Sequence, residues 1–335
     1  MKRRILAVLM AAVMVSSLVA CGNTKENKND GDKDLEKITF VLDWTPNTNH
    51  TGLYVAQEKG YFKDAGLEVE IVQPAEDSAE ALVGLGRAQF GVSFQDSMAP
   101  ALAKEDALPI TAVAAIIQHN TSGIISRKGE GMHTPKGMEG HNYATWEGPI
   151  ELATLKQVVE KDGGNFDKVK MSPSTVTDEV SALKSKMVDS IWIFYAWAGV
   201  KAELEELETD YFAFADIDPV FDYYTPVIIA GNDFLKEKPE IAKAFLQAVT
   251  QGYEFAMEHP DEAAEILCEA ADGLDLKLVK ASQNYLADKY QAEASKWGYI
   301  DATRWNNFYN WLNEKDLVEK DIPENTGFSN EYLPE

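Results

Sequence analysis

Residues 37–60 have the sequence KITFVLDWTPNTNHTGLYVAQEKG, and their pattern sets the expectation for the rest of the chain. The stretch begins with a short apolar run, passes through a polar turn around Pro46, and ends in a segment with helical spacing that closes on Gly60. Glycine directly after the last helical turn is the usual left-handed stop of a helix. A strand, a turn and a helix in this order predict the first unit of an α/β fold.

The same alternation continues along the chain. LEVEIVQ (67–73) alternates apolar and charged residues as a strand does, SAEALVGLGRAQ (78–89) has helical spacing, and FGVSF (90–94) is another short apolar run. Further strands are predicted at 109–117, 122–126, 141–146, 189–194 and 225–231, and long helices at 239–259, 259–273 and 275–290. Such alternation predicts α/β layers with largely parallel strands.

The first residues carry a targeting signal. Three basic residues at 2–4 precede a short apolar run, which predicts a secretory signal peptide over 1–20 rather than a transmembrane anchor. The ending Leu-Val-Ala-Cys at 18–21 is similar to a bacterial lipobox, in which Cys21 is lipidated and becomes the mature N-terminus. A plain signal peptide that contains a cysteine is the alternative. We therefore expect an extracytoplasmic protein that is lipid-anchored to the bacterial cell membrane.

Composition limits the possible partners. Residues 21–36 contain almost no apolar side chain, so we expect a flexible tether before a folded part that starts near Lys37. The remaining chain of roughly 300 residues exceeds what a single core usually supports, which favours two lobes. The net charge of −24 repels phosphate backbones and argues against nucleic acid as a partner.

Several kinds of chemistry can be set aside. With Cys21 assigned to lipid, Cys268 is the one remaining cysteine, so we expect neither a disulfide framework nor a multi-cysteine metal site. A helical pattern places Cys268 in the core. The motifs G-x-x-x-x-G-K-[ST], H-E-x-x-H and G-x-S-x-G are all absent, and no histidines are paired at ligand spacing on an evident helix. We expect no catalytic residue, no metal and no cofactor.

Aromatic and polar side chains gather at the carboxyl ends of predicted strands, where ligands bind in open α/β sheets. They form four groups: Asp43, Trp44, Asn47, Asn49 and His50; Ser93, Phe94, Gln95, Asp96 and Ser97; Trp146 and Glu147; and Tyr195 and Trp197. Groups at equivalent positions in two lobes would converge on one cleft. The expected ligand-binding residues are Trp44, Asn47, His50, Phe94, Gln95, Trp146, Glu147, Tyr195 and Trp197.

Structural roles compete with ligand contact in the first group. Trp44 stacks on a ligand or covers the core, since tryptophan is mostly buried wherever it lies. Asn47 and Asn49 flank the turn at Pro46, and asparagine at a turn or a helix cap needs no ligand. His50 either caps the following helix or faces the cleft.

The other groups leave similar choices open. The segment 93–97 is the start of the helix 96–104, or it presents exposed amides to an electronegative ligand group. Either Glu147 or Glu151 faces the cleft, and an exposed carboxylate at a helix start is the alternative.

In WIFYAW (192–197), strand alternation puts Trp192 and Phe194 on one face and Ile193 and Tyr195 on the other. This favours Tyr195 and Trp197 for the cleft. Three later tryptophans fall among helices and are expected to be packing residues: Trp297, Trp305 and Trp311.

Three segments carry a resemblance to a known family: DWTPNTNHTGLYVAQEKGYFKDAGLEVEI (43–71), GVSFQDSMAPALAK (91–104) and TPKGMEGHNYATW (134–146). They resemble the NMT1/THI5-like family of periplasmic binding proteins, especially the pyrimidine (thiamine-precursor) binders of ABC importers. The resemblance implies a two-lobed type II fold that closes over a ligand by hinge motion. Lobe one would be 37–127 plus 225–335, and lobe two 128–224, with crossovers near 122–126 and 225–231.

The resemblance also implies partners and a ligand. The partners are a small molecule, an ABC permease and an ATPase, and the binding protein itself is a monomer. An aminopyrimidine such as formylaminopyrimidine or hydroxymethylpyrimidine needs aromatic faces and an acceptor for its amine. Trp44 with Trp146 or Tyr195 would provide the faces, and Glu147 the acceptor. His50 or Asn47 would bond a ring nitrogen.

Other members of the family define the alternatives. Riboflavin or another flat heterocycle would use the same aromatic side chains, whereas a sulfonate or taurine is disfavoured by nearby Asp43, Asp96 and Glu147. The family also contains hydroxymethylpyrimidine phosphate synthases, whose fungal members carry a CCCFC segment. The corresponding stretch here is FDYYTPVIIA (221–230), so we expect a binding protein and not an enzyme.

Overall fold

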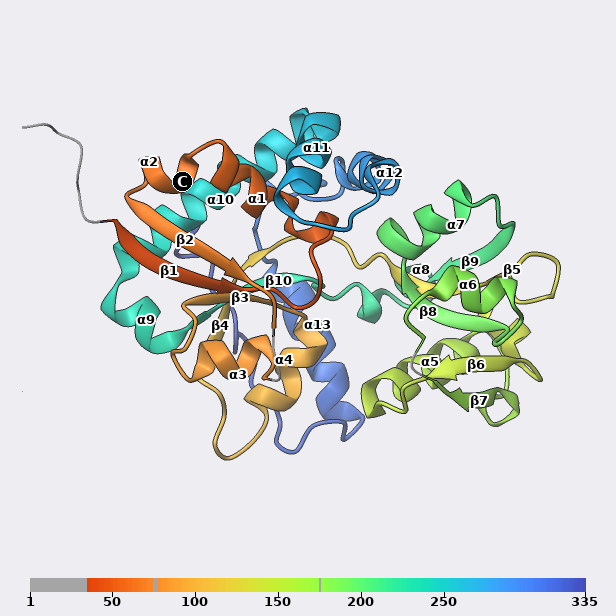
Figure 1. Ribbon diagram of the computed structural model, residues 1–335. Helices are drawn as coiled ribbons and strands as arrows, with labels where there is room; N and C mark the ends of the chain where they lie inside the picture. Colours follow the sequence, from red (N-terminus) through yellow and green to blue (C-terminus); the bar gives the residue numbers. More distant parts are fainter. Residues whose placement is uncertain (1–34, 75–76, 175) are drawn as a thin grey trace, which may run out of the picture. The chain divides into compact units, whose positions relative to one another are not determined.

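The computed structural model describes residues 35–74, 77–174 and 176–335 (Figure 1). The predicted signal peptide 1–20, Cys21 and the tether up to residue 34 lie outside the described residues. The first strand begins at Glu36, so the last residue of the predicted tether belongs to the folded part. Within the described part of the chain, no helix combines the length and the apolar character that crossing a membrane requires.

The first sheet has five strands in the order β2-β1-β3-β10-β4. Its strands are β1 (Glu36–Val41), β2 (Leu67–Val72), β3 (Phe90–Ser93), β4 (Ile110–Ala115) and β10 (Val227–Gly231). β1 pairs in parallel with β2 and β3, whereas β10 runs antiparallel to its neighbours β3 and β4. Four strands therefore point the same way, and β10 is reversed.

The second sheet repeats this plan in the order β7-β6-β8-β5-β9. Its strands are β5 (Ser122–Arg127), β6 (Asn142–Thr145), β7 (Lys170–Pro173), β8 (Ser190–Phe194) and β9 (Thr209–Ala213). β6 pairs in parallel with β7 and β8, and β5 runs antiparallel to β8 and β9. The reversed strand of each sheet is the one that follows a connection from the other sheet. By position, β1 is equivalent to β6, and β3 to β8.

Sheet pairing moves one of the predicted lobe boundaries. The segment 122–127 was expected to end the first lobe, but it forms β5 and pairs with β8 and β9 in the second sheet. The first connection therefore lies at 116–121, before β5. A buried apolar strand has the same sequence pattern in either sheet, so only its partners reveal where it belongs. The second connection precedes β10, which pairs with β3 and β4 in the first sheet.

Helices cover both faces of the first sheet. They are the short η1 (Thr48–His50), α1 (Thr51–Glu58), α2 (Tyr61–Asp64), α3 (Ala79–Gly84), α4 (Gln95–Leu102), α9 (Asn232–Glu237), α10 (Pro239–Glu258), α11 (Pro260–Ala270), α12 (Leu276–Leu286) and α13 (Ala302–Glu314). Successive residues of β1 serve different cores, because strand side chains alternate between faces. Phe40 packs with α1, α2 and α10, and Val41 packs with α3, α4 and α13.

Helix α1 approaches α10 closely enough to require glycine on both. A Cβ on Gly252 would lie 2.0 Å from the carbonyl oxygen of Gly52, and a Cβ on Gly52 would lie 2.3 Å from the Tyr253 ring. Both distances are far inside van der Waals contact. The close contact matters for the site, because α1 begins directly after the loop that carries Trp44.

The second lobe uses shorter helices around its sheet. They are η2 (Pro135–Met138), α5 (Pro149–Lys161), η3 (Phe166–Lys168), α6 (Glu179–Lys184), the π-helical turn η4 (Tyr195–Gly199), α7 (Val200–Leu204), α8 (Phe214–Ile217) and η5 (Pro219–Phe221). The turn η4 directly follows β8, and π-helical turns are often found at functional sites.

The late tryptophans pack as predicted. Trp297, Trp305 and Trp311 are all buried, and each indole N–H donates to an oxygen: the Ile116 carbonyl, the Thr326 carbonyl and the Gln157 side chain, respectively. Cys268 differs from the prediction. It is half-buried at the margin of a small cluster, because it lies at the edge of the apolar stripe of α11 and not at its centre.

Candidate ligand pocket

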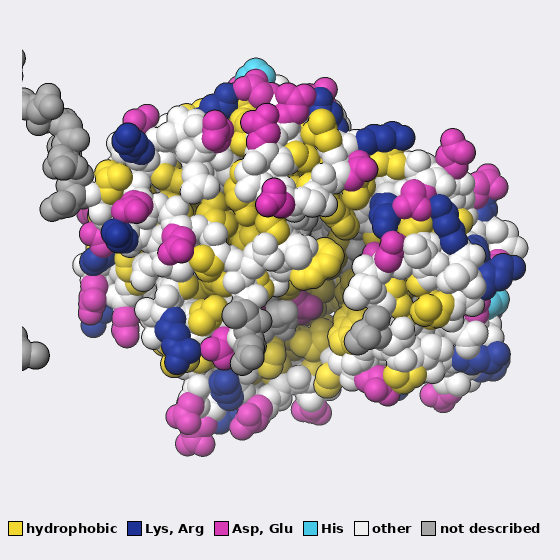
Figure 2. Space-filling model, viewed as in Figure 1, with side chains coloured by type: hydrophobic (Ala, Val, Ile, Leu, Met, Phe, Trp, Pro, Cys, Tyr) yellow, Lys and Arg dark blue, Asp and Glu magenta, His cyan; other side chains and the backbone are white. Residues whose placement is uncertain are grey.

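A hollow of about 300 Å³ lies between the carboxyl-terminal strand ends of the two sheets. Its lining comes from both lobes: Asp43, Trp44, Asn47, Asn49 and Phe94 from the first, and Glu179, Phe194, Trp197 and Ala198 from the second. In Figure 2, hydrophobic side chains gather along the central hollow, and most charged side chains lie on the outer parts of the visible face. The volume is at the lower end of the range for small-molecule sites.

Two phenylalanines at equivalent positions meet across this pocket. Phe94 is the N-cap of α4 directly after β3, and Phe194 is the N-cap of η4 at the end of β8. Their rings are stacked, with centroids 6.0 Å apart and planes 17° from parallel. Phe194 is one of the few large hydrophobic side chains that remain exposed. The pair presents flat apolar surface from both lobes to the pocket.

Two tryptophans that follow equivalent strands are unusually exposed. Trp44 follows β1 and is 52% exposed, and Trp146 follows β6 and is 58% exposed. Trp44 lines the pocket. Trp146 is not among the lining residues and instead packs edge-on against Trp192, with ring centroids 5.4 Å apart. Trp44 is therefore available to a ligand in the pocket as the structure stands.

The loop from Asp43 to His50 is braced by its own side chains. His50 is fully buried, its Nε2 lies 2.7 Å from Asp43 Oδ1, and its Nδ1 accepts from the backbone N–H of Asn47 at 3.2 Å. The second contact makes Nε2 the protonated nitrogen that donates to Asp43. Asn47 caps η1 by accepting from the Asn49 N–H at 2.9 Å. Both ring nitrogens of His50 are thus engaged within the loop, where the ring completes the capping box of η1. His50 makes no side-chain cap to the following helix α1, and it does not line the pocket, so neither role predicted for it is observed.

Three hydroxyl groups fix the same loop to α10, to α12 and to the segment that follows α12. The Tyr253 hydroxyl of α10 donates to the Asn49 carbonyl at 2.6 Å. The Tyr290 hydroxyl donates to the Thr48 carbonyl at 2.6 Å, and the Thr48 and Ser282 hydroxyls are 2.6 Å apart. These bonds hold the Trp44 side of the pocket in place before a ligand arrives, which reduces the ordering cost of binding.

Gln95 and Tyr195 were expected at the ligand, but the structure turns them away from the pocket. Gln95 is buried, donates to the Trp305 carbonyl at 2.8 Å and accepts from the Tyr224 N–H at 2.9 Å. Tyr195 donates to the Glu203 carboxylate, and its ring packs against Tyr211 and Tyr285. Because β8 gives way to η4 at Tyr195, strand alternation no longer fixes the direction of this side chain.

Of the two glutamates considered after β6, Glu151 is engaged inside the second lobe. Its buried carboxylate accepts from the Tyr143 hydroxyl at 2.8 Å, the Thr145 hydroxyl at 3.1 Å and the backbone N–H groups of Trp146 and Gly148. Glu147 is exposed and has a positive φ of 60°. The buried carboxylate of Glu151 therefore shapes the loop that carries Trp146, and Glu147 extends toward solvent.

Four of the nine predicted ligand residues line the pocket: Trp44, Asn47, Phe94 and Trp197. Sequence reasoning missed Glu179, Phe194 and Ala198. Glu179 begins α6, and burial raises the pKa of its carboxyl. Its only sequence signal is its place after Asp178, which caps the helix by accepting from the Ser181 N–H at 3.0 Å. Phe194 was assigned to the core face by strand alternation, which ends at this residue.

Asp96 lies next to Gln95 in the first turn of α4. Its Oδ1 is buried and has no hydrogen-bond partner, and its Oδ2 accepts from the Tyr223 hydroxyl at 3.4 Å. Burial raises the pKa of this carboxyl to about 6. Asp96 is not among the residues that line the pocket.

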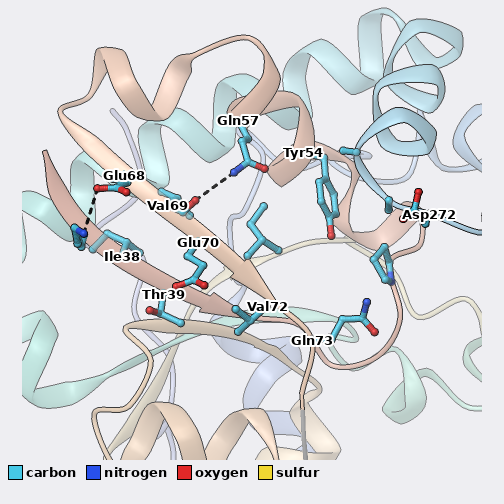
Figure 3. A pocket seen from close by; sticks show the side chains of 15 residues that line it. Ile38, Thr39, Tyr54, Gln57, Glu68, Val69, Glu70, Val72, Gln73 and Asp272 are labelled. Carbon is cyan, nitrogen blue, oxygen red and sulfur yellow. Dashed lines mark hydrogen bonds and ion pairs between the residues drawn. The ribbon is translucent and has the colours of Figure 1, made fainter.

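A larger hollow of about 1130 Å³ lies along β1 and β2, beside α1 (Figure 3). Among the described residues that line it, polar side chains such as Gln57, Glu68, Glu70 and Gln73 occur with a similar number of apolar ones, and Tyr54 is the one aromatic residue. Gln57 donates to the Val69 carbonyl at 3.2 Å, and this bond covers part of the edge strand. The hollow runs along the edge of the first sheet as far as the end of β2, and the described residues that line it all belong to the first lobe. In the described residues, no group of three His, Cys, Asp or Glu is arranged to hold a metal ion.

Comparison with known proteins places the chain in a family. A family model described as "NMT1/THI5 like" matches residues 47–263. The chain belongs to the NMT1/THI5-like family. A formylaminopyrimidine-binding protein of Halalkalibacterium halodurans is 28% identical over 335 residues, which cover 97% of this chain and 98% of the relative. A 4-amino-5-hydroxymethyl-2-methylpyrimidine phosphate synthase of Legionella pneumophila is 28% identical over 243 residues, covering 70% and 73% of the two chains.

Solved structures agree on the fold. The alkanesulfonate-binding protein SsuA from Xanthomonas axonopodis pv. citri superposes with a TM-score of 0.65 at 11% identity, covering 89% of this chain and 99% of that one. This NMT1/THI5-like chain therefore has the two-lobed type II fold of periplasmic binding proteins, as the resemblance implied. The fold and the binding-protein relative together support a solute-binding role.

Proposed function

We propose that this NMT1/THI5-like protein is the extracytoplasmic solute-binding lipoprotein of an ABC importer. In this proposal it captures a thiamine pyrimidine precursor, formylaminopyrimidine or hydroxymethylpyrimidine, and delivers it to the permease. The observation that carries the proposal is the composition of the pocket: three large aromatic side chains and a carboxylate from α6 surround a space of about 300 Å³ beside the exposed ring of Trp44.

The pocket chemistry suits a flat ring with an amino group. Trp44 and the stacked pair Phe94 and Phe194 offer apolar faces to a heteroaromatic ring. An exocyclic amine needs an acceptor, and the carboxylates of Asp43 and Glu179 line the same space. None of the described residues that line this pocket is Lys or Arg, so a sulfonate would find no opposite charge there. The lining thus favours an aminopyrimidine over an anion.

We propose binding without catalysis. The fungal synthases of the family that this chain resembles carry a cysteine-rich CCCFC segment. This chain contains two cysteines, Cys21 and Cys268, which are far apart in sequence. In place of a cysteine run, the stretch before β10 contains Tyr223 and Tyr224, both of which are buried. Cys21 has a different proposed role, which is to carry the lipid that anchors the protein to the membrane.

A binding panel tests this function. The full chain is titrated in thermal-shift and calorimetric assays with formylaminopyrimidine, hydroxymethylpyrimidine, thiamine, riboflavin and taurine. A ligand that binds only the folded state stabilises it by about 2.7 kcal/mol at a hundred times its Kd, so the melting temperature must rise. We expect saturable binding of one of the two pyrimidine precursors. Binding of riboflavin or taurine alone would overturn the proposed ligand.

The anchor has its own test. Cells that express the protein are grown with radiolabelled palmitate, and the Cys21→Ser variant is the matched control. We expect label on the wild-type chain and none on the variant. Equal labelling of both would show that Cys21 is not the lipid site, and no labelling of either would favour a plain signal peptide.

A further inference from the structure

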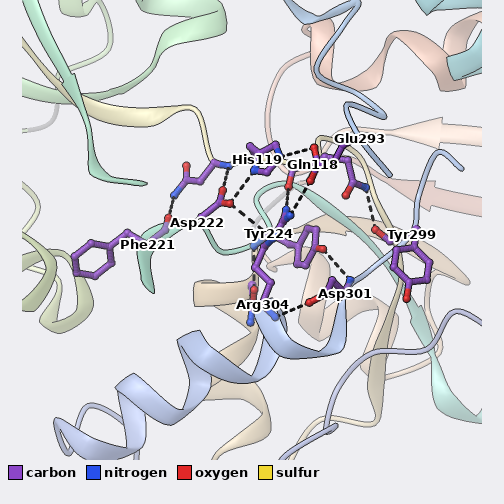
Figure 4. A network of polar contacts seen from close by, with 11 residues as sticks. Gln118, His119, Phe221, Asp222, Tyr224, Glu293, Tyr299, Asp301 and Arg304 are labelled. Carbon is purple, nitrogen blue, oxygen red and sulfur yellow. Dashed lines mark hydrogen bonds and ion pairs between the residues drawn. The ribbon is translucent and has the colours of Figure 1, made fainter. Parts of the chain in front are cut away.

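The two connections between the sheets meet at one imidazole ring (Figure 4). His119 lies in the first connection, and Asp222 lies in the second. The Nδ1 of His119 is 2.7 Å from Asp222 Oδ2, and its Nε2 is 2.8 Å from Glu293 Oε2 in the loop after α12. A single ring therefore joins both connections to each other and to the body of the first lobe.

Arg304 of α13 adds the opposing charge. Its guanidinium is 3.2 Å from Glu293 Oε1 and 3.7 Å from Asp222 Oδ2, and it also donates to the Gln118 carbonyl. The Arg304 side chain lies over the ring of Tyr224, 5.0 Å from its centroid. The charged groups that face His119 are therefore two carboxylates and one guanidinium, and Tyr224 covers the far side of Arg304.

Two further hydrogen bonds join the connections without using the imidazole. The Asn120 backbone N–H donates to Asp222 Oδ1 at 3.0 Å, and its side-chain amide donates to the Phe221 carbonyl at 2.9 Å. Asp222 is thus held by Asn120 and Arg304 in addition to His119. Loss of the His119 contacts would loosen this junction and leave the two connections attached to each other.

Only a protonated imidazole can satisfy both of its neighbours. Each ring nitrogen faces a carboxylate oxygen, and a neutral ring has one donor and one lone pair, so it would turn a lone pair toward one carboxylate. The hydrogen bond to Asp222, with a further contribution from Glu293, raises the pKa of His119 above its ordinary value. The His119 side chain is 43% exposed, so water can reach it to exchange the proton.

We propose that His119 is a pH-sensitive brace of the hinge formed by the two connections: when protonated it binds Asp222 and Glu293 together, and when neutral it releases one of these two carboxylates, which loosens the junction and eases reorientation of the lobes. The inference concerns the hinge alone and does not depend on the identity of the ligand. Because the folded state binds the proton more tightly than the unfolded chain does, the brace is fully present below about pH 6.5 and is lost as pH rises through the folded pKa.

The first test measures the proton. Imidazole resonances of the full chain are followed by NMR over pH, and the signal of His119 is assigned by its absence in His119→Gln. We expect the titration midpoint of His119 to lie above about pH 6.5 and to be lower in Glu293→Gln, because that variant removes the negative charge of one acceptor. Glu293 is exposed, so this variant keeps the fold. A midpoint at or below 6.5, unchanged in Glu293→Gln, would overturn the proposal.

The second test measures the hinge. Donor and acceptor dyes are attached to L85C in the first lobe and M187C in the second, both exposed sites, after Cys21→Ser and Cys268→Ala. We expect the transfer efficiency to change with pH at the NMR midpoint of His119. His119→Gln should give the high-pH efficiency at every pH, and His133→Gln, at an exposed histidine of the second lobe, should titrate like the parent protein. A pH-independent efficiency, or an unchanged titration in His119→Gln, would contradict the brace.

Discussion

Replacing Trp44 with alanine removes the most exposed aromatic face of the pocket, and the loss can be estimated. A tryptophan has about 250 Å² of surface, of which 52% is exposed here, or about 130 Å². If a ligand ring covers about half of that area, burial contributes about 1.6 kcal/mol at 25 cal/mol per Å². Stacking adds about 0.5–1.5 kcal/mol. The total of about 2–3 kcal/mol corresponds to binding that is about 30- to 150-fold weaker.

Calorimetry of Trp44→Ala with formylaminopyrimidine measures this loss. Trp44→Phe keeps a smaller ring and should lose only part of the affinity, and Leu85→Ala, which removes an exposed apolar side chain outside the pocket, should bind like the wild type. The melting temperature without ligand should change little in all three, because the replaced side chains are exposed. An unchanged Kd in Trp44→Ala would refute a stacking role for this ring.

Three further outcomes follow from other residues. Glu179→Gln should weaken pyrimidine binding about 10-fold or more. Because burial raises the pKa of the Glu179 carboxyl, the affinity of the wild type should fall as pH falls through that raised pKa, and calorimetry should find no such fall in the variant. Asp96→Asn should raise the melting temperature above pH 6.5 but not below pH 4. The pKa of Asp96 in the folded wild type is about 6, so its ionisation destabilises the fold as pH rises, by up to about 3 kcal/mol. Gly252→Ala should lower the melting temperature by several degrees, because its new Cβ would meet the Gly52 carbonyl at 2.0 Å and overpacking costs about 1–3 kcal/mol. Equal melting temperatures of the variant and the wild type would show that α1 and α10 adjust freely.

The sequence located the pocket better than it identified the contacts. Alternating strands and helices place side chains such as Trp44, Phe94 and Trp146 at strand ends, and ligand sites of α/β sheets lie there for reasons of topology. The equivalence of β1 with β6 and of β3 with β8 then brings the groups after β1, β3 and β8 to one pocket, although the group after β6 does not line it. This much depends only on local pattern and chain order.

The direction of individual side chains could not be predicted in the same way. His50 and Gln95 are polar residues at strand ends, but their partners are Asp43, Trp305 and Tyr224, and the last two are far along the chain. A local pattern contains no information about such distant partners. Two other predictions were wrong for related reasons. The exposure of the Phe194 ring depends on where β8 ends, and the assignment of 122–127 to the first lobe depended on which sheet accepts that strand.

The shared plan of the two sheets also explains why the pocket is aromatic on both sides. Phe94 directly follows β3, Phe194 is the last residue of β8, and each is an N-cap with extended backbone. An N-cap side chain after a buried strand lies at the sheet edge, outside the helix that follows. Two such positions in facing lobes bring one aromatic ring from each lobe to the same pocket, where the two rings stack on each other.

The most direct test of the central claim is a crystal structure of the full chain with formylaminopyrimidine. We expect electron density for the pyrimidine among Trp44, Phe94 and Phe194, with its amine directed toward the carboxylate of Glu179 or Asp43. Density in the hollow along β1 and β2, or none in the aromatic pocket at saturating ligand, would contradict it.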